Sequence, residues 1–278
     1  MAFTGLKAGW SLAKSVRALV SGDRSLLIYP VISGIIGVVL FGLTFLGSLF
    51  IPIDFPVHWK IIVGVAISYV VTGFVSTYFL VAMLISFKSY EAGDRIGMGE
   101  ALARTRPYTV RILEWAIFYT ILVMILRAIE SRFRGISQIV VAGVGSLGIT
   151  IATFFAVPAI LEKKVGPIDA VKESLGTIRR TVGPVFGGVV YIDLYTLIFT
   201  LGGMLLALAG GIFMPNLVLK VILIGTGVAI MVLGMVLNFT YFNILKLLLY
   251  DYFNGEKLPE GIDETLVQQA IKRRGKLL

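Results

Sequence analysis

The sequence predicts an all-α membrane protein, a polytopic bundle of six transmembrane helices with three amphipathic helices at the membrane interface. Its composition is the first observation: of the 278 residues, 57% are hydrophobic and only 15% are charged, with a mean hydropathy of +0.92. A soluble domain of this composition could not cover itself with polar groups, so lipid must be its solvent. The lengths of the apolar segments and the placement of the basic residues are the second and third observations.

The apolar segments are long enough to cross a bilayer as helices. A hydrocarbon core of about 30 Å needs roughly 20 apolar residues in a helix, because only a helix or a closed barrel satisfies its backbone hydrogen bonds in lipid. We end the fifth helix near Ala209, because Gly210, Gly211, Pro215 and Asn216 interrupt the apolar run. The predicted spans are residues 25–50, 61–87, 110–129, 135–161, 181–209 and 221–249. Pro30 and Pro158 are expected to kink their helices.

The basic residues predict which ends of the spans face the cytoplasm. Positive side chains are retained on the cytoplasmic side, and with the N-terminus inside, nearly all lysines and arginines fall there. The exceptions are Lys60, Arg127, Arg132, Arg134 and Lys220. The sequence therefore predicts a multi-pass protein of the cytoplasmic membrane with both termini inside. Lys7 and Lys272 are expected on the cytoplasmic side, and His58 and Lys220 on the external side.

Three short segments with basic residues precede the first, third and fifth spans. Residues 3–20, 98–108 and 167–180 each place apolar side chains on one helical face and charged ones on another, as interfacial helices do. Each segment leads into a pair of spans, which suggests three tandem units, 1–87, 98–161 and 167–250, within one domain of residues 1–250. Such helices are common beside membranes, so unrelated juxtamembrane helices are the alternative. Residues 251–278 form a predicted cytoplasmic tail with a short amphipathic helix capped by Asp263.

Four stretches carry a resemblance to a known family. They are Gly-Trp-Ser-Leu-Ala-Lys-Ser at 9–15, Asp-Arg-Ser-Leu-Leu-Ile-Tyr-Pro at 23–30, Thr-Phe-Phe-Ala-Val-Pro at 153–158 and Gly-Pro-Ile-Asp-Ala at 166–170. Over most of its length the chain resembles the six-helix membrane family catalogued as domain of unknown function 6159. It is also distantly similar to the membrane domain attached to some glycerophosphodiester phosphodiesterases. That second resemblance implies fold but no activity, because the phosphodiesterase barrel and its metal ligands are missing.

Small residues recur at four-residue spacing on three of the predicted spans. Such stripes allow close helix packing, and a subunit interface or a polar pore lining is the alternative. The stripes are Gly64, Ser68, Thr72 and Ser76; Ala142, Ser146 and Thr150; and Gly203, Ala207 and Gly211.

One polar set inside the spans is the candidate site: Asp193, Asn238, Asn243 and Lys246. An ionised carboxylate in lipid costs on the order of 3 kcal/mol, so Asp193 must face a partner, and we expect Asn243 or Lys246 on the antiparallel sixth helix. The set is either a structural tie between helices or a proton or cation relay.

Nothing in the sequence indicates an enzyme. There is no HExxH, GxSxG or Walker A pattern, and His58, the only histidine, cannot form a two-histidine metal site. Cysteine is absent, which excludes thiolate ligands and disulfides. We expect no cofactor, no metal and no nucleic-acid partner.

The expected partners are anionic lipid headgroups and further copies of the chain. The predicted function is a non-enzymatic, structural or oligomer-forming scaffold, with a channel or transporter for a small solute or ion that uses Asp193 as the alternative.

Overall fold

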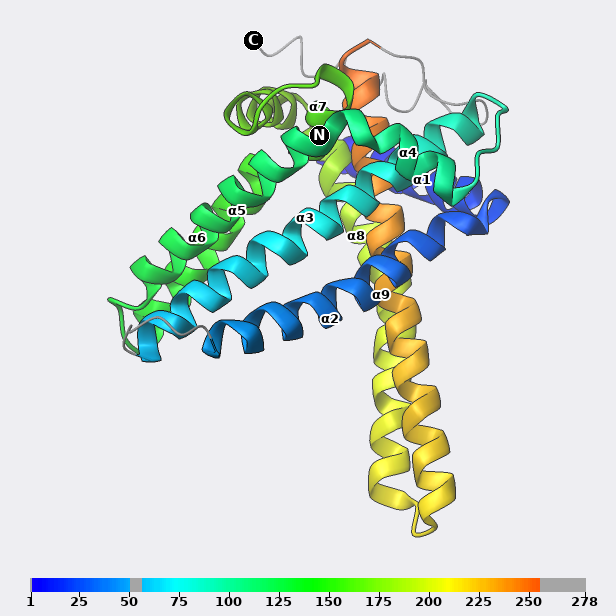
Figure 1. Cartoon of the computed structure of the whole chain (residues 1–278). Coiled ribbons are helices and arrows are strands. Elements are labelled where there is room, and N and C mark those ends of the chain that lie inside the picture. Colours follow the sequence, from blue (N-terminus) through cyan, green and yellow to red (C-terminus); the bar gives the residue numbers. More distant parts are fainter. Residues whose placement is uncertain (1, 51–56, 256–278) are drawn as a thin grey trace. The chain divides into compact units, whose positions relative to one another are not determined.

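The computed structural model describes residues 2–50 and 57–255, and every regular element within them is helical (Figure 1). The elements are α1 (Ala2–Gly22), η1 (Arg24–Leu27), α2 (Ile28–Leu49), α3 (Val57–Glu91), α4 (Met98–Thr105), η2 (Arg106–Tyr108), α5 (Thr109–Glu130), α6 (Ile136–Thr153), α7 (Ala156–Lys163), α8 (Pro167–Phe213) and α9 (Leu217–Phe253). The predicted amphipathic helix of the tail lies outside the described residues.

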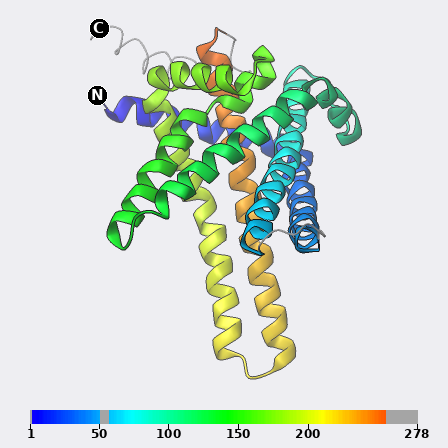
Figure 2. The same cartoon turned by 60° about the vertical axis from the view of Figure 1, so that its left-hand side comes forward.

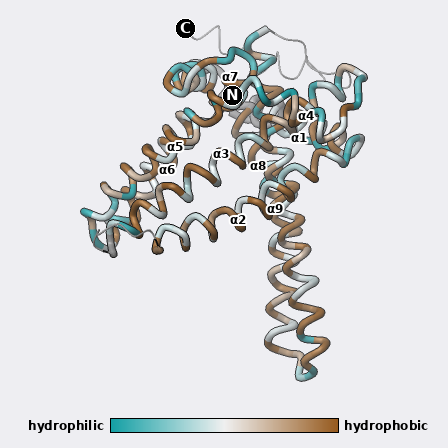
Figure 3. Tube along the Cα trace, in the orientation of Figure 1, coloured by the Kyte–Doolittle hydropathy of each residue, from teal (hydrophilic) through white to brown (hydrophobic). Residues whose placement is uncertain are grey.

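Six helical stretches of the described chain are long and apolar enough to cross a membrane. They are Arg24–Leu49, Trp59–Glu91, Met98–Glu130, Ile136–Lys163, Val185–Phe213 and Leu217–Phe253. Hydrophobic residues dominate these helices along most of their length, as the colouring of Figure 3 shows. The predicted fold class, an all-α protein with six transmembrane helices, is therefore confirmed.

The chain divides into two compact units. Unit 1 combines residues 1–27 with residues 181–278, and unit 2 comprises residues 28–180. Unit 1 thus holds α1, η1, most of α8 and all of α9, while unit 2 holds the helices between them. The division of the chain into three tandem repeats stays a prediction.

Within unit 2, α2 and α3 form a hairpin and lie side by side (Figure 2). The hydroxyls of Thr44 and Ser68 share a hydrogen bond of 2.8 Å across the seam. A methyl group on Gly64 would collide with the side chain of Ser48. The predicted small-residue stripe of the second span is therefore an interhelical packing surface, which is the use that such stripes commonly have.

The fourth span is bent. α6 ends at Thr153 and α7 begins at Ala156, within the segment predicted as one helix over 135–161. Pro158 explains the break, because proline has no N–H for the carbonyl of Phe154, four residues earlier, and its ring clashes with that carbonyl. Pro30, in contrast, lies in the first turn of α2, where proline costs no intrahelical hydrogen bond.

Two predicted boundaries of the last hairpin are wrong. α8 is one helix from Pro167 to Phe213, so the 167–180 segment is its first part and the fifth span ends beyond Ala209. Lipid offers no hydrogen bonds to a free backbone, so glycines that would end a helix in water can stay helical there. α9 begins at Leu217 rather than near residue 221. The side chain of Asn216 caps it, accepting bonds of 2.9 and 3.2 Å from the N–H groups of Val218 and Leu219.

Candidate functional site

The candidate site lies on the hairpin of α8 and α9 in unit 1, two helices that run side by side in both views (Figures 1 and 2). Glycines bring their backbones together. A Cβ atom on Gly203 would lie 2.6 Å from the Met231 nitrogen, and one on Gly227 would lie 2.5 Å from the Ala207 nitrogen. Gly203 and Ala207 of the predicted stripe are therefore packing residues of this seam.

Further along the seam, one amide joins two polar groups of α8. The Nδ2 atom of Asn238 donates to Oδ1 of Asp193 and to Oγ1 of Thr196, both at 2.9 Å. The Thr196 hydroxyl in turn donates to the carbonyl of Ile192 at 2.8 Å. Thr196 is buried, while Asp193 lies at the edge of the seam and is exposed. We call Asp193, Thr196 and Asn238 the amide cluster.

The structure brings together two of the four predicted site residues. Asp193 does face α9, but its partner is Asn238 and not Asn243 or Lys246. Nδ2 of Asn243 donates to the carbonyl of Phe239 in its own helix at 2.8 Å, and Nζ of Lys246 lies 4.2 Å from the centre of the Phe242 ring. The expected partner was wrong, although the register is as predicted because α8 and α9 each extend about four residues closer to their connecting turn. Pairing across that turn places Asn238, and not Asn243 one turn farther along α9, opposite Asp193.

Helix length places the amide cluster near one boundary of the hydrocarbon core. At a rise of 1.5 Å per residue, Asp193 lies about 30 Å from Phe213, the last residue of α8. Asn238 lies about as far from Leu217, the first residue of α9. The hydrocarbon core is itself about 30 Å thick. With the turn between the helices at one boundary, helix length puts the cluster near the other, about two turns inside the candidate span Val185–Phe213.

Beside the amide cluster, α1 packs against the hairpin. Its apolar residues Leu12 and Val16 are buried, and α1 contacts α9. Two other α1 side chains reach aromatic residues of α8. The rings of Trp10 and Tyr191 meet edge to face, 4.8 Å apart, and Cζ of Arg17 lies 4.5 Å from the centre of the Tyr195 ring. Nη1 of Arg17 also donates to the Tyr191 hydroxyl at 3.4 Å.

The contact of Arg17 with Tyr191 and Tyr195 was missed in the sequence. The hydrogen bond that Arg17 donates to the Tyr191 hydroxyl raises the pKa of Arg17, because it favours the charged guanidinium. The sequence carries a partial signal, because Trp10 and Arg17 are two turns apart on α1 and the two tyrosines are one turn apart on α8. Both pairs can therefore lie on single helical faces, but nothing in the sequence pairs the faces with each other.

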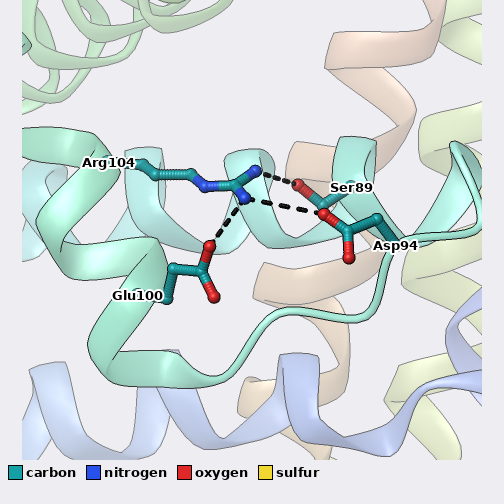
Figure 4. A network of polar contacts seen from close by, with 4 residues as sticks. All are labelled: Ser89, Asp94, Glu100 and Arg104. Atoms are coloured by element: carbon teal, nitrogen blue, oxygen red, sulfur yellow. Dashed lines mark hydrogen bonds and ion pairs between the residues drawn. The ribbon is translucent and has the colours of Figure 1, made fainter.

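In unit 2 the conspicuous polar groups are ion pairs. Arg104 of α4 bonds Glu100 at 2.6 Å and the Ser89 hydroxyl of α3 at 3.1 Å, and it lies 3.5 Å from Asp94 (Figure 4). This network fastens α4 to the end of α3. Within the described residues, no three histidine, aspartate or glutamate side chains gather as metal ligands would.

These features define a polytopic α-helical membrane protein. A family model described as "Family of unknown function (DUF6159)" matches residues 56–257, so the chain belongs to that family, as its sequence motifs predicted. No curated protein and no solved structure matches the chain. The similarity to the membrane domain of glycerophosphodiester phosphodiesterases therefore has no support in these comparisons.

Proposed function

We propose that the chain is a non-enzymatic scaffold of the cytoplasmic membrane that assembles with further copies of itself. The amide cluster is the observation that carries this proposal. One Asn238 amide satisfies both Asp193 and Thr196, which is what a tie between two helices requires. Hydrogen bonds of this kind across membrane helices contribute about 1 kcal/mol each.

The surroundings of Asp193 favour a tie over an ion relay. A relay across the bilayer needs a succession of polar or titratable groups at increasing depth. Between Asp193 and Phe213, α8 has no other acidic or basic residue. The hydroxyl of Thr200, one turn beyond Thr196, donates to the Thr196 carbonyl at 3.2 Å, which is a bond within its own helix.

The proposed orientation places both termini and the amide cluster on the cytoplasmic side. It rests on the distribution of lysine and arginine, of which the turn between α8 and α9 has only Lys220 nearby. The basic residues at the opposite ends of the spans would then face anionic headgroups of the inner leaflet.

Substitutions at Asp193 distinguish the scaffold function from the alternative, a channel or transporter. In liposomes with an imposed pH gradient, we expect the wild type to pass no more protons or cations than empty liposomes. Asp193→Asn keeps a side chain that can bond Asn238, so the melting temperature in detergent should hold. Asp193→Leu should lower it, by about 1 kcal/mol of stability. Thr196→Val is the matched control for loss of the other bond to Asn238.

Two results would overturn the proposal. A proton or cation flux of the wild type that Asp193→Asn abolishes, with the fold intact, would establish the ion-coupling alternative. A single copy per particle at every protein-to-lipid ratio, measured by the mass of the protein in lipid nanodiscs, would exclude assembly into a scaffold.

A further inference from the structure

We propose that Arg17 and Lys14 of α1 form a binding site for the phosphate group of an anionic phospholipid. Arg17 lies against Tyr195 and Tyr191 of α8, and Lys14 lies one helical turn before it on the same exposed face. Nothing in the scaffold function requires this site, which is separate from the amide cluster.

Arg17 is held in a geometry suited to a phosphate. Its guanidinium lies over the face of Tyr195 at 4.5 Å, a cation–π arrangement that fixes the group at little cost in hydration. Nη1 donates to the Tyr191 hydroxyl, which leaves Nη2 and Nε for an outside acceptor. Arginine is the side chain that binds phosphate oxygens through two parallel N–H bonds, and the ring removes much of the freedom that Arg17 would otherwise lose on binding.

Within the described residues, no carboxylate balances the charge of this face. In the described part of the chain, neither Arg17 nor Lys14 forms an ion pair with a carboxylate. Arg104, Arg111 and Arg127 of unit 2, in contrast, each bond a glutamate three or four residues away on the same helix. Among the described residues Lys14 and Arg17 are therefore open to an added anion, and the partner that fits them is negatively charged.

The depth of the site selects a membrane lipid as the source of that anion. Tyr191 lies about 33 Å and Tyr195 about 27 Å from Phe213 along α8. These distances bracket the thickness of the hydrocarbon core and reach the layer of lipid phosphates. Leu12 and Val16 are already buried in protein, so the face that α1 offers to the membrane is the one with Lys14 and Arg17. Trp10, 41% exposed, is a residue typical of this layer.

Retention of lipid by the purified protein tests the site. The full chain is reconstituted in nanodiscs of equal parts phosphatidylglycerol and phosphatidylcholine, extracted in mild detergent, and its bound lipids are counted by native mass spectrometry. We expect the wild type to retain phosphatidylglycerol in preference to phosphatidylcholine. Removing one basic contact with an anionic lipid should lower that preference about fivefold, so Arg17→Gln and Lys14→Gln should each do so.

The control variants separate a built site from diffuse surface charge. Arg24→Gln removes one positive charge from the exposed residue that begins η1, in the same unit but away from the tyrosines, and it should leave the preference unchanged. Arg17→Lys keeps the charge but loses the planar fork, and Tyr195→Leu removes the ring, so both should lower retention. Tyr195→Phe keeps the ring face and should retain the lipid.

Three results would overturn the inference. They are equal retention of the two lipids by the wild type, an Arg17→Gln variant that retains phosphatidylglycerol like the wild type, and an equal loss in Arg24→Gln. Displacement of the lipid by millimolar inorganic phosphate would point to a soluble phosphate and would equally contradict the lipid assignment. Circular dichroism and gel filtration establish that each variant is folded, and the Lys14→Gln and Arg17→Lys variants decide the question if Tyr195→Leu is not.

Discussion

The hydroxyl of Ser174 accepts a hydrogen bond of 2.9 Å from the backbone N–H of Phe155, 19 residues earlier in the chain. Phe155 is the residue at which the fourth span bends, between the end of α6 and the start of α7. A bend leaves N–H groups at the start of the new helix without intrahelical partners. The first part of α8 therefore supplies the acceptor that the bend at Pro158 makes necessary.

Ser174→Ala should destabilise unit 2. Ser174 is fully buried, so its loss removes the acceptor of the Phe155 N–H, at a cost of about 1 to 3 kcal/mol. Thermal unfolding in detergent measures the change. Ser146→Ala is the matched control, because Ser146 is exposed and bonds a carbonyl of its own helix, and it should change stability by less than about 0.5 kcal/mol. Equal melting temperatures for the two variants would contradict a supporting role for Ser174.

Gly227→Ala should force α8 and α9 apart. A Cβ atom at this position would lie 2.5 Å from the Ala207 nitrogen and 2.5 Å from the Gly203 carbonyl oxygen, and backbone atoms cannot move away as a flexible side chain can. We expect a loss of about 1 to 3 kcal/mol, as in other overpacked sites, measured by unfolding in detergent.

Gly225→Ala is the control for that substitution. It lies two residues away in the same helix, and a Cβ atom there would meet nothing within 4 Å. Because alanine is the better helix former, this variant should be neutral or more stable, by up to about 1 kcal/mol. The hairpin seam would be misassigned if Gly225→Ala proved the more harmful of the two.

Hydropathy was sufficient to locate the six spans, because each is an apolar run long enough to cross lipid. It could not locate their ends. The Gly210–Gly211 pair predicts a helix end from rules that hold for helices in water, whereas α8 continues to Phe213. Hydropathy also identified Asp193 as a residue in need of a partner, because the cost of an unpaired carboxylate follows from composition and depth alone.

The contacts that the sequence did not predict join residues far apart in the chain. Arg17 and Tyr195 belong to the first and eighth helices, and Phe155 and Ser174 to two segments separated by a turn. None of these residues stands out in the sequence of its own segment, and only tertiary packing brings the two partners of each pair together. The small-residue stripes were more informative, because a glycine every fourth residue on an apolar helix indicates close approach whichever helix is the partner.

The ion pair between Lys88 of α3 and Glu162 of α7, 2.8 Å long, should contribute modestly to unit 2. The two side chains are 34% and 20% exposed, so solvent screens part of their attraction. A double-mutant cycle of Lys88→Met and Glu162→Gln should give a coupling below about 1 kcal/mol. The same cycle at the more exposed pair Lys172 and Asp169 should give none. A larger coupling at Lys172 would show that exposure does not set the strength of these pairs.

Single cysteines test the proposed orientation, in a chain that has no native cysteine to confuse the result. Lys7→Cys should be protected from a membrane-impermeant maleimide in intact cells, and Lys220→Cys should react. Lysis of the cells should allow the reagent to label the cysteine at residue 7. Labelling of residue 7 from outside would reverse the topology, and with it the leaflet of the lipid site at Arg17.

The depth of the α8 residues can be measured with spin labels on its exposed face. Leu194, Met204 and Ile212 are each exposed in unit 1, and helix length places the first and last near opposite boundaries of the hydrocarbon, with Met204 about midway. In liposomes, a label at 204 should collide most with oxygen, which concentrates in lipid, and labels at 194 and 212 should collide more with a water-soluble nickel complex. If the label at 194 collides with oxygen as often as the label at 204, Asp193 lies inside the hydrocarbon. The argument that its neighbours Tyr191 and Tyr195 reach the lipid phosphates then fails, and a membrane-buried role for the carboxylate gains support.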